Sequence, residues 1–299
     1  MSPSAQPRLV GPGTRLRGVA RLIDPEFANV GEGLRVRRTL PTQHVQSVGP
    51  WVFLDHYGPA RMAAGHGGVP AHPHAGIETV SYLFEGGMAH RDSAGHAGSV
   101  DAGGAQWMTA GAGIVHEEKP RGPEGAPEFT LHGVQMWTTL PRSLKFAAPA
   151  YQNLPAAELP VVERNGASVR VIGGAFDGVA SPAATRMPLF LWHVTLEPGA
   201  AFAAPVPAGF EAAVYVVAGA ARIAGAVAAL GQLAVLEGDG GVALANASAS
   251  AALDVLVFGG APAEGPLLFH GPFVMNSAEQ LRRVERAYLS GGMGTLAPA

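Results

Sequence analysis

Glycine and proline are scattered along almost the whole of this chain, and they limit how long any regular element between them can be. Forty-one glycines and 25 prolines lie among 299 residues, most of them between short apolar runs. Glycine favours turns and proline removes a backbone donor, so neither suits the interior of a long helix. Short apolar runs separated by turns are typical of sandwiches and barrels. The sequence therefore predicts an all-β fold.

The strand-like runs form two series with a bridge between them. The first series occupies residues 33–39, 49–55, 78–84, 104–108 and 133–138, and the second occupies residues 168–173, 189–196, 212–217, 231–236 and 253–258. Residues 141–160 are polar, punctuated by proline and without sustained periodicity, so we interpret them as a linker. A chain of this length can bury two ordinary cores. We therefore predict two β-barrel domains, residues 1–145 and residues 146–299.

One segment near the end of the chain predicts a helix. Ser277 and Gln280 have the spacing of a capping box, and Val284 and Tyr288 continue an apolar stripe at helical spacing. Gly291 then supplies a stop signal. We expect a short C-terminal helix that covers an open barrel edge.

The charge balance excludes one class of partner. Twenty Lys and Arg residues stand against 23 Asp and Glu residues, for a net charge of −3. No stretch concentrates basic charge enough to follow a phosphate backbone, and the most basic run, residues 35–38, is better explained as the solvated face of a strand. We expect no direct contact with nucleic acid.

The chain has no cysteine, so it has no disulfide, thiolate ligand or cysteine nucleophile. Residues 1–25 contain no apolar core of a signal peptide. The apolar run 212–230 is broken by Gly219, Arg222 and Gly225, which favours two buried strands joined by a turn over a membrane span. These features are compatible with the reducing cytoplasm, where we expect the protein, with no membrane partner.

Histidines are concentrated in one part of the chain. Seven of the eleven lie within residues 56–116, and a His-Pro-His triplet places His72 and His74 two residues apart. Residues i and i+2 of a strand point to the same face, so both imidazoles can reach one metal ion. His116 and Glu118 repeat this spacing further along. Three nitrogens and one carboxylate suit Fe(II), Mn(II), Ni(II), Cu(II) or Zn(II), so we interpret the chain as a mononuclear metalloprotein.

Two longer motifs around these residues resemble the pirins, a branch of the cupin superfamily. The first is HPHAGIETVSYLFEG, residues 72–86, and the second is QWMTAGAGIVHEE, residues 106–118. The segments GPWVFLDH, residues 49–56, and GPFVMN, residues 271–276, agree with this resemblance. The resemblance implies a bicupin with two β-barrel domains, the N-terminal one holding a single metal ion, typically iron.

The resemblance also implies which side chains bind the metal, and they are the same four that the spacing selects: His72, His74, His116 and Glu118. Cupins often take their carboxylate ligand from the glutamate four residues after the His-x-His motif, which here is Glu78. In pirins the carboxylate comes from the second motif, so we interpret Glu78 as a structural or supporting residue. Glu117 should point out of the barrel, because adjacent strand residues face opposite sides.

The remaining histidines lack such a pattern. His56, His66, His90 and His96 have no second histidine two residues away, so each is interpreted as a loop or hydrogen-bonded histidine. His56 and His66 are also candidates for the mouth of the site. No His-x-His motif recurs in the second half, so the second barrel is expected to hold no metal.

Four protein ligands on an octahedral ion leave two positions for water, substrate or dioxygen. This favours a chemical role over a purely structural one, because structural sites are usually closed. The resemblance implies a quercetin 2,3-dioxygenase activity, in which a flavonol is opened by O2 with release of carbon monoxide. Glu118 would accept the proton of the flavonol hydroxyl.

Two alternatives stay open. Other pirins resemble regulators that bind protein partners and use the iron as a redox sensor. The same fold and metal site also suit an enzyme that acts on another small aromatic or enol-bearing metabolite, because fold and metal do not fix the substrate.

Overall fold

The computed structural model describes residues 15–296, which form two compact units of β-sheet. One, here the N-terminal unit, comprises Glu26–Leu159 together with the chain from Ala263 onward. The other, the C-terminal unit, comprises Pro160–Pro262 together with the chain up to Pro25. The units thus differ from the expected division at residues 145 and 146, because each terminal segment belongs to the other half's unit. Residues 1–14, part of the segment expected to lack a signal, lie outside the described residues.

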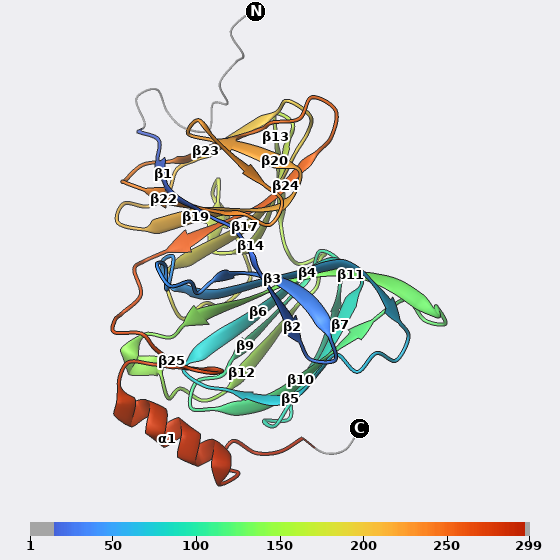
Figure 1. The fold of residues 1–299 in the computed structure, drawn as a ribbon, viewed down its shortest axis with the longest axis vertical. Helices are drawn as coiled ribbons and strands as arrows, with labels where there is room; N and C mark the ends of the chain where they lie inside the picture. Colours follow the sequence, from blue (N-terminus) through green and yellow to red (C-terminus); the bar gives the residue numbers. More distant parts are fainter. Residues whose placement is uncertain (1–14, 297–299) are drawn as a thin grey trace, which may run out of the picture. The chain divides into compact units, whose positions relative to one another are not determined.

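The N-terminal unit contains two larger antiparallel sheets (Figure 1). The seven-stranded sheet has the order β12 (Ala150–Leu154), β9 (Ala105–Thr109), β6 (Ile77–Glu85), β11 (Glu128–Thr139), β4 (Trp51–Ala63), β3 (Leu34–Leu40) and β2 (Glu26–Val30). The four-stranded sheet has the order β5 (Val69–His74), β10 (Ile114–Arg121), β7 (Gly87–Asp92) and β8 (Ala97–Asp101). A hairpin of β25 (Leu268–His270) and β26 (Phe273–Met275) completes the strands of this unit.

The C-terminal unit repeats this combination of sheets. Its seven-stranded sheet has the order β1 (Gly18–Ile23), β22 (Leu233–Glu237), β19 (Glu211–Ala218), β24 (Leu253–Gly260), β17 (Leu189–Leu196), β14 (Ala167–Gly173) and β13 (Val161–Arg164). Its four-stranded sheet has the order β18 (Ala201–Ala204), β23 (Val242–Asn246), β20 (Ala220–Ile223) and β21 (Ala226–Ala229). The pair β15 (Ala175–Phe176) and β16 (Val179–Ala180) lies outside both sheets.

The all-β prediction is confirmed, and each of the ten expected strand-like runs coincides with a strand. The apolar run 212–230 forms β19, β20 and β21, and no described helix is long and apolar enough to cross a membrane. The expected linker is more structured than its sequence indicates. It contains a 3-10 helix, Arg142–Leu144, and β12, which pairs with β9. Backbone hydrogen bonds hold this polar segment at the edge of the sheet, and no side-chain pattern in the sequence predicts a strand there.

Apolar side chains fill the space between the sheets of each unit. In the C-terminal unit, Val194 and Val214 of the large sheet share a core with Phe202 of the small one. In the N-terminal unit, Leu83 of the large sheet packs with Met88 of the small one. Alternate residues of each strand point inward, as the period of two requires.

The C-terminal helix forms where the sequence predicts it. Helix α1 (Ala278–Leu289) begins after Ser277, whose hydroxyl accepts a hydrogen bond from the Gln280 backbone N–H. The Gln280 side chain in turn accepts from the backbone N–H of Asn276, so orphan donors at this end are paired. Val284 is buried against β26, and α1 therefore covers the β25–β26 hairpin (Figure 1).

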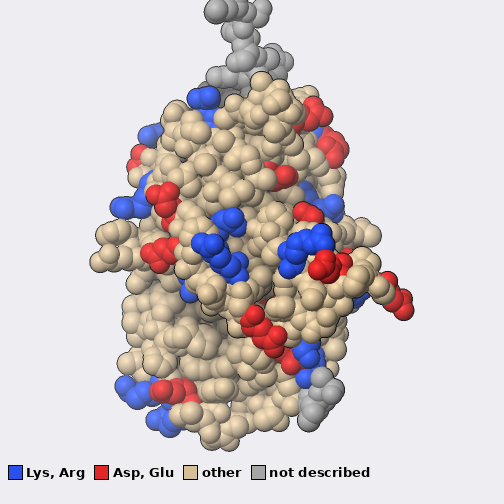
Figure 2. Space-filling view, turned by 45° about the vertical axis from the view of Figure 1, so that its right-hand side comes forward, with Lys and Arg blue, Asp and Glu red and all other residues tan. Residues whose placement is uncertain are grey.

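Charged side chains are dispersed over the face of the protein shown in Figure 2. Lys and Arg residues are mixed with Asp and Glu residues there, some of them in contact, and uncharged surface surrounds them. This mixture of both signs agrees with the small net charge of −3.

A fully buried lysine ties three segments of the N-terminal unit together. The Lys145 ammonium donates hydrogen bonds to the carbonyls of Gly76 and Val274, each 2.8 Å long, and to the Thr139 hydroxyl at 2.7 Å. Burial lowers the pKa of Lys145 to about 7, against a smaller opposing effect of Glu264. Three acceptors match the three hydrogens of the ammonium form. Lys145 therefore fixes the turn that follows β5.

Replacing Lys145 with Met should destabilise the protein by about 2–4 kcal/mol, because three buried acceptors lose their donor. Urea unfolding measures this change. Lys119→Met is the control, because Lys119 is partly exposed and its ion pair with Glu117 contributes at most about 1 kcal/mol. Equal stabilities for the two variants would contradict this role of Lys145.

Two histidines from neighbouring strands form a second buried polar contact. The Nε2 atoms of His56 on β4 and His132 on β11 lie 2.8 Å apart, and His56 is fully buried. Burial, followed by the proximity of His132 and Arg37, lowers the pKa of His56 to about 3. His56 is therefore neutral in the folded protein at neutral pH.

This depressed pKa predicts a loss of stability in acid. Below pH 6.5, the ordinary histidine pKa, His56 is protonated in the unfolded chain but stays neutral in the folded protein. The free energy of unfolding therefore falls as the pH decreases from 6.5 towards 3. Between pH 8 and pH 5 the wild type should lose about 2 kcal/mol more than His56→Gln, which keeps a hydrogen-bonding side chain but does not titrate. Denaturant titrations at both pH values measure the difference. Parallel losses in the two proteins would refute the assignment.

Candidate metal centre

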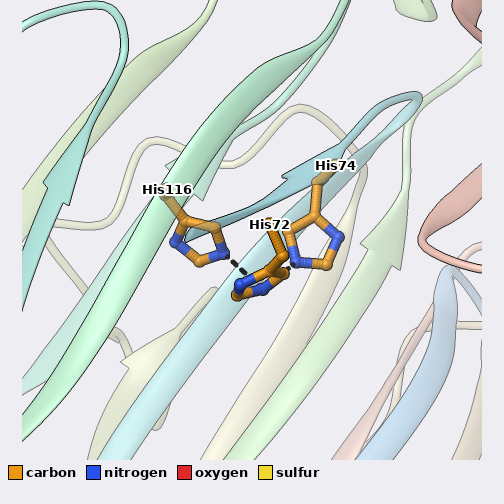
Figure 3. Close-up of side chains that lie close together, drawn as sticks. All are labelled: His72, His74 and His116. Carbon is orange, nitrogen blue, oxygen red and sulfur yellow. Dashed lines mark hydrogen bonds between the residues drawn. The ribbon is translucent and has the colours of Figure 1, made fainter. Parts of the chain in front are cut away.

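Two paired strands of the small sheet bring three histidines together. His72 and His74 lie on β5, and His116 lies on β10 directly opposite His72 in the antiparallel register. Residues two apart on one strand share a face, so the rings of His72 and His74 both turn towards His116. Figure 3 shows the three rings pointing at one another from these strands. The structure therefore brings together three of the four predicted ligands.

The spacing of the three rings suits one metal ion. The Nε2 atom of His72 lies 3.1 Å from that of His74 and 3.0 Å from that of His116. All three ligand nitrogens lie within 4.8 Å of one another. Nitrogens about 2.1 Å from a common ion and at right angles to one another would be about 3 Å apart. The imidazoles therefore fit a first-row metal.

The outward nitrogen of each ring has a hydrogen-bond partner. His72 Nδ1–H donates to the Pro70 carbonyl at 2.8 Å, and His74 Nδ1–H donates to the Pro272 carbonyl at 3.3 Å. His116 Nδ1 lies 3.4 Å from Nδ1 of His90. An N–H at each Nδ1 leaves the Nε2 lone pairs facing the centre, as metal binding requires.

Burial favours the neutral form of His74 and His116. It lowers the pKa of His74 well below 6.5, and neighbouring His72 adds to this effect. It also lowers the pKa of His116, with smaller effects from His74, His72 and His90. Neutral imidazoles bind metal without first losing a proton.

Glu118 lies in the same cavity but is held by other side chains. The Ser81 hydroxyl donates to one Glu118 carboxylate oxygen at 2.6 Å, and the Gln135 amide donates to the other at 2.7 Å. A register shift between His116 and Glu118 in the β10–β5 pairing places Glu118 opposite Val69. Among the described residues, the potential metal group that comes together consists of the three histidines.

The other two glutamates lie where the sequence predicts. Glu78 is fully buried and accepts a hydrogen bond from the Thr109 hydroxyl at 2.7 Å and a longer one from Thr138, so it has a structural role. Glu117 lies between His116 and Glu118 on β10 and pairs with Arg91 and Lys119. Its alternation with its neighbours turns it away from the histidine cluster.

A cavity of about 540 Å³ opens onto the histidines. Its walls are mostly apolar, and its polar groups include His72, His74, Glu118, Ser81, Gln135 and Tyr57. The segment before α1 contributes Phe269, Gly271 and Pro272. The lining includes neither His56 nor His66, the two candidates for the mouth. His56 is buried against His132, and His66 Nδ1 accepts from the Gly68 backbone N–H.

Aromatic rings form one wall of this cavity. The Trp137 ring stacks on Phe53 at 4.0 Å between centroids, and its other neighbour is the His74 ring at 4.9 Å. The Arg38 guanidinium covers Phe53 at 4.6 Å and is held by Asp55. The row of planar groups runs from His74, which meets Trp137 edge-on, to the Arg38–Asp55 pair, and such an aromatic wall suits a flat aromatic molecule.

Sequence reasoning missed the position of His90. His90 and Asp92 lie on β7, opposite Glu118 and His116 respectively on β10. Both side chains are buried, and His90 Nε2 lies 3.1 Å from Asp92 Oδ2. Their i, i+2 spacing was a usable signal, because it repeats that of His116 and Glu118.

Known proteins share both the sequence and the fold of this chain. Residues 33–138 match the Pirin family, and residues 191–294 match the Pirin C-terminal cupin domain. Human Pirin is 40% identical over 258 residues, which cover 84% of this chain and 85% of the human protein. A pirin-like protein of Solanum lycopersicum is 34% identical over 284 residues, which cover 94% of each chain.

Solved structures extend this similarity. The 1.88 Å crystal structure of quercetin 2,3-dioxygenase from Acinetobacter baumannii has a TM-score of 0.86 and 29% identity, covering 95% of this chain and all of that one. The two β units described above are therefore cupin domains, as expected of a bicupin. Sequence and fold lead to one conclusion: this chain belongs to the pirin family.

Proposed function

We propose that this pirin is a mononuclear metal-dependent dioxygenase that opens flavonols such as quercetin with O2 and releases carbon monoxide. The observation that carries the proposal is the convergence of three imidazoles, two of which, His72 and His74, line a cavity of about 540 Å³. The structural similarity to quercetin 2,3-dioxygenase from Acinetobacter baumannii supports the choice of substrate.

The residues that would hold the ion are His72, His74 and His116, with Glu118 as the fourth ligand. Fe(II) is the ion we propose, and the same donors also accept Mn(II), Ni(II), Cu(II) or Zn(II). When bound, the ion would supply Lewis acidity and open coordination positions for oxygen ligands. Glu118 lines the cavity beside His72 and His74, and to bind the ion its carboxylate would give up a hydrogen bond from Ser81 or Gln135 while keeping the other.

Glu118 is also the group we propose as proton acceptor. Its carboxylate lines the cavity, and the Ser81 and Gln135 side chains hold its two oxygens in a defined orientation. A flavonol hydroxyl within hydrogen-bond distance would lose its proton to this carboxylate, and the resulting phenolate-like oxygen is the better partner for a cation.

The cavity walls would position the flavonol. The Phe53 and Trp137 side chains line the cavity with aromatic surface, and apolar residues such as Val36 and Met88 exclude water. Tyr57 lines the cavity, and its buried hydroxyl has no hydrogen-bond partner within residues 15–296. A substrate oxygen would supply the missing acceptor.

Replacing His74 with Ala should abolish iron-dependent turnover, because one of three converging nitrogens is lost. The test loads purified protein anaerobically with Fe(II), adds quercetin and air, and follows flavonol absorbance, oxygen uptake and carbon monoxide. His66→Ala is the control, because His66 lies outside the cavity lining. Metal content and turnover that survive in His74→Ala would reject the proposal. Stoichiometric metal without turnover in the wild type would favour redox-linked binding of a protein partner or another substrate.

Replacing Glu118 with Gln should lower the turnover number about 100-fold or more, because the amide cannot accept the proton. Iron binding should weaken, by about tenfold, since three histidines remain. Steady-state kinetics and metal titration measure the two effects. Glu117→Gln makes the same change on the opposite face of β10 and should alter neither. Unchanged turnover in Glu118→Gln would remove Glu118 from the mechanism.

A further inference from the structure

His116 differs from the other two histidines of the cluster in what supports its outward nitrogen. His72 and His74 each donate to a backbone carbonyl, whereas His116 Nδ1 faces the imidazole of His90 at 3.4 Å. His90 Nε2 in turn lies 3.1 Å from the carboxylate of Asp92. The side chains of His90 and Asp92 are 2% and 0% exposed, so water does not compete for these contacts.

The Asp92 carboxylate determines which ring nitrogens of His90 and His116 carry hydrogen atoms. A carboxylate only accepts, so His90 must carry its hydrogen on Nε2 to bond with Asp92. The Nδ1 atom of neutral His90 then has a lone pair, and it can bond with His116 only if His116 Nδ1 carries a hydrogen. The Nε2 atom of His116 is consequently left with a lone pair that points at His72.

We propose that His90 and Asp92 are positioning residues that fix the tautomer of His116 and strengthen its Nε2 as a metal donor. This inference rests on the proposed metal centre. The charge of Asp92 polarises His90, which makes His90 Nδ1 a stronger acceptor for the His116 Nδ1–H. The stronger hydrogen bond increases the electron density at His116 Nε2. The backbone carbonyls behind His72 and His74 carry no such charge.

Further contacts hold Asp92 and the His90 ring in place. The Asp92 oxygen Oδ1 accepts hydrogen bonds from the backbone N–H groups of Ala94 and His96, each 3.0 Å long, which fixes the carboxylate. Burial of Asp92 raises its pKa, but hydrogen bonds from His90 and His96 outweigh this effect and lower the pKa overall, so the carboxylate stays charged. The Tyr151 ring on β12 stacks on His90 at 4.4 Å with an interplanar angle of 10°.

This geometry predicts a specific consequence for Asp92→Asn. The amide oxygen of the new asparagine would accept the hydrogen bonds from the backbone N–H groups of Ala94 and His96. Its NH2 group would then face His90 and donate to Nε2 of His90, which must therefore carry a lone pair instead of a hydrogen. His90 then presents an N–H to His116, and His116 must move its own hydrogen to Nε2. That hydrogen occupies the position that a metal ion needs, although the shape of the site is unchanged.

The test needs neither substrate nor turnover. Nitrogen-15 NMR of the metal-free protein reports which nitrogen of His116 carries the hydrogen, and titration with Ni(II) measures metal affinity. The wild type should have the hydrogen on Nδ1. Asp92→Asn should move it to Nε2 and weaken Ni(II) binding about 10- to 100-fold, with the melting temperature measured alongside.

Two variants separate the hydrogen bond from packing. In His90→Gln the side-chain carbonyl can still accept from His116 Nδ1–H, so the tautomer should be kept and the affinity should fall less than in His90→Phe, which fills the space without an acceptor. Asp254→Asn is the matched control, because Asp254 bonds to His193 in the C-terminal unit, away from the cluster. Asp254→Asn should change neither the His116 tautomer nor the Ni(II) affinity.

The proposal is overturned if Asp92→Asn leaves either the His116 tautomer or the Ni(II) affinity unchanged, or if His90→Gln and His90→Phe lose affinity equally. A wild type that binds Ni(II) but does not turn over quercetin when loaded with Fe(II) would refute the dioxygenase and leave this inference intact. A wild type that binds no metal would refute the metal centre itself.

Discussion

The antiparallel pairing of β5 with β10 is the constraint on which the candidate site depends. It places His116 opposite His72, and the alternation of side chains along β5 brings His74 to the same face. No loop has to close for the three nitrogens to meet. The site therefore lies on hydrogen-bonded strands, which hold side chains more precisely than loops do.

Residues distant in the sequence also support the three histidines. The carbonyl of Pro272, 198 residues after His74, accepts its outward N–H, and Lys145 clamps the adjacent turn to the same C-terminal segment. The chain from Ala263 onward, which returns to the N-terminal unit, thus supports the candidate metal centre. This explains why a simple division of the sequence into two halves does not describe the units.

The convergence of His72, His74 and His116 could be predicted from the sequence, whereas their surroundings could not. Their spacing of two residues is visible in any strand, and the motif around them is specific. The hydrogen bonds of Glu118 could not be predicted, because Ser81 and Gln135 come from β6 and β11, and a register shift moves Glu118 itself. The pairing of β12 was equally hidden, since backbone atoms rather than an apolar pattern place it beside β9.

Anomalous diffraction at the iron edge, from crystals of the Fe(II)-loaded protein with quercetin, tests the central claim most directly. The account predicts one strong peak about 2.1 Å from the Nε2 atoms of His72, His74 and His116, with the flavonol in the adjoining cavity. A peak at any other place, or iron-loaded crystals with the flavonol outside that cavity, would contradict it.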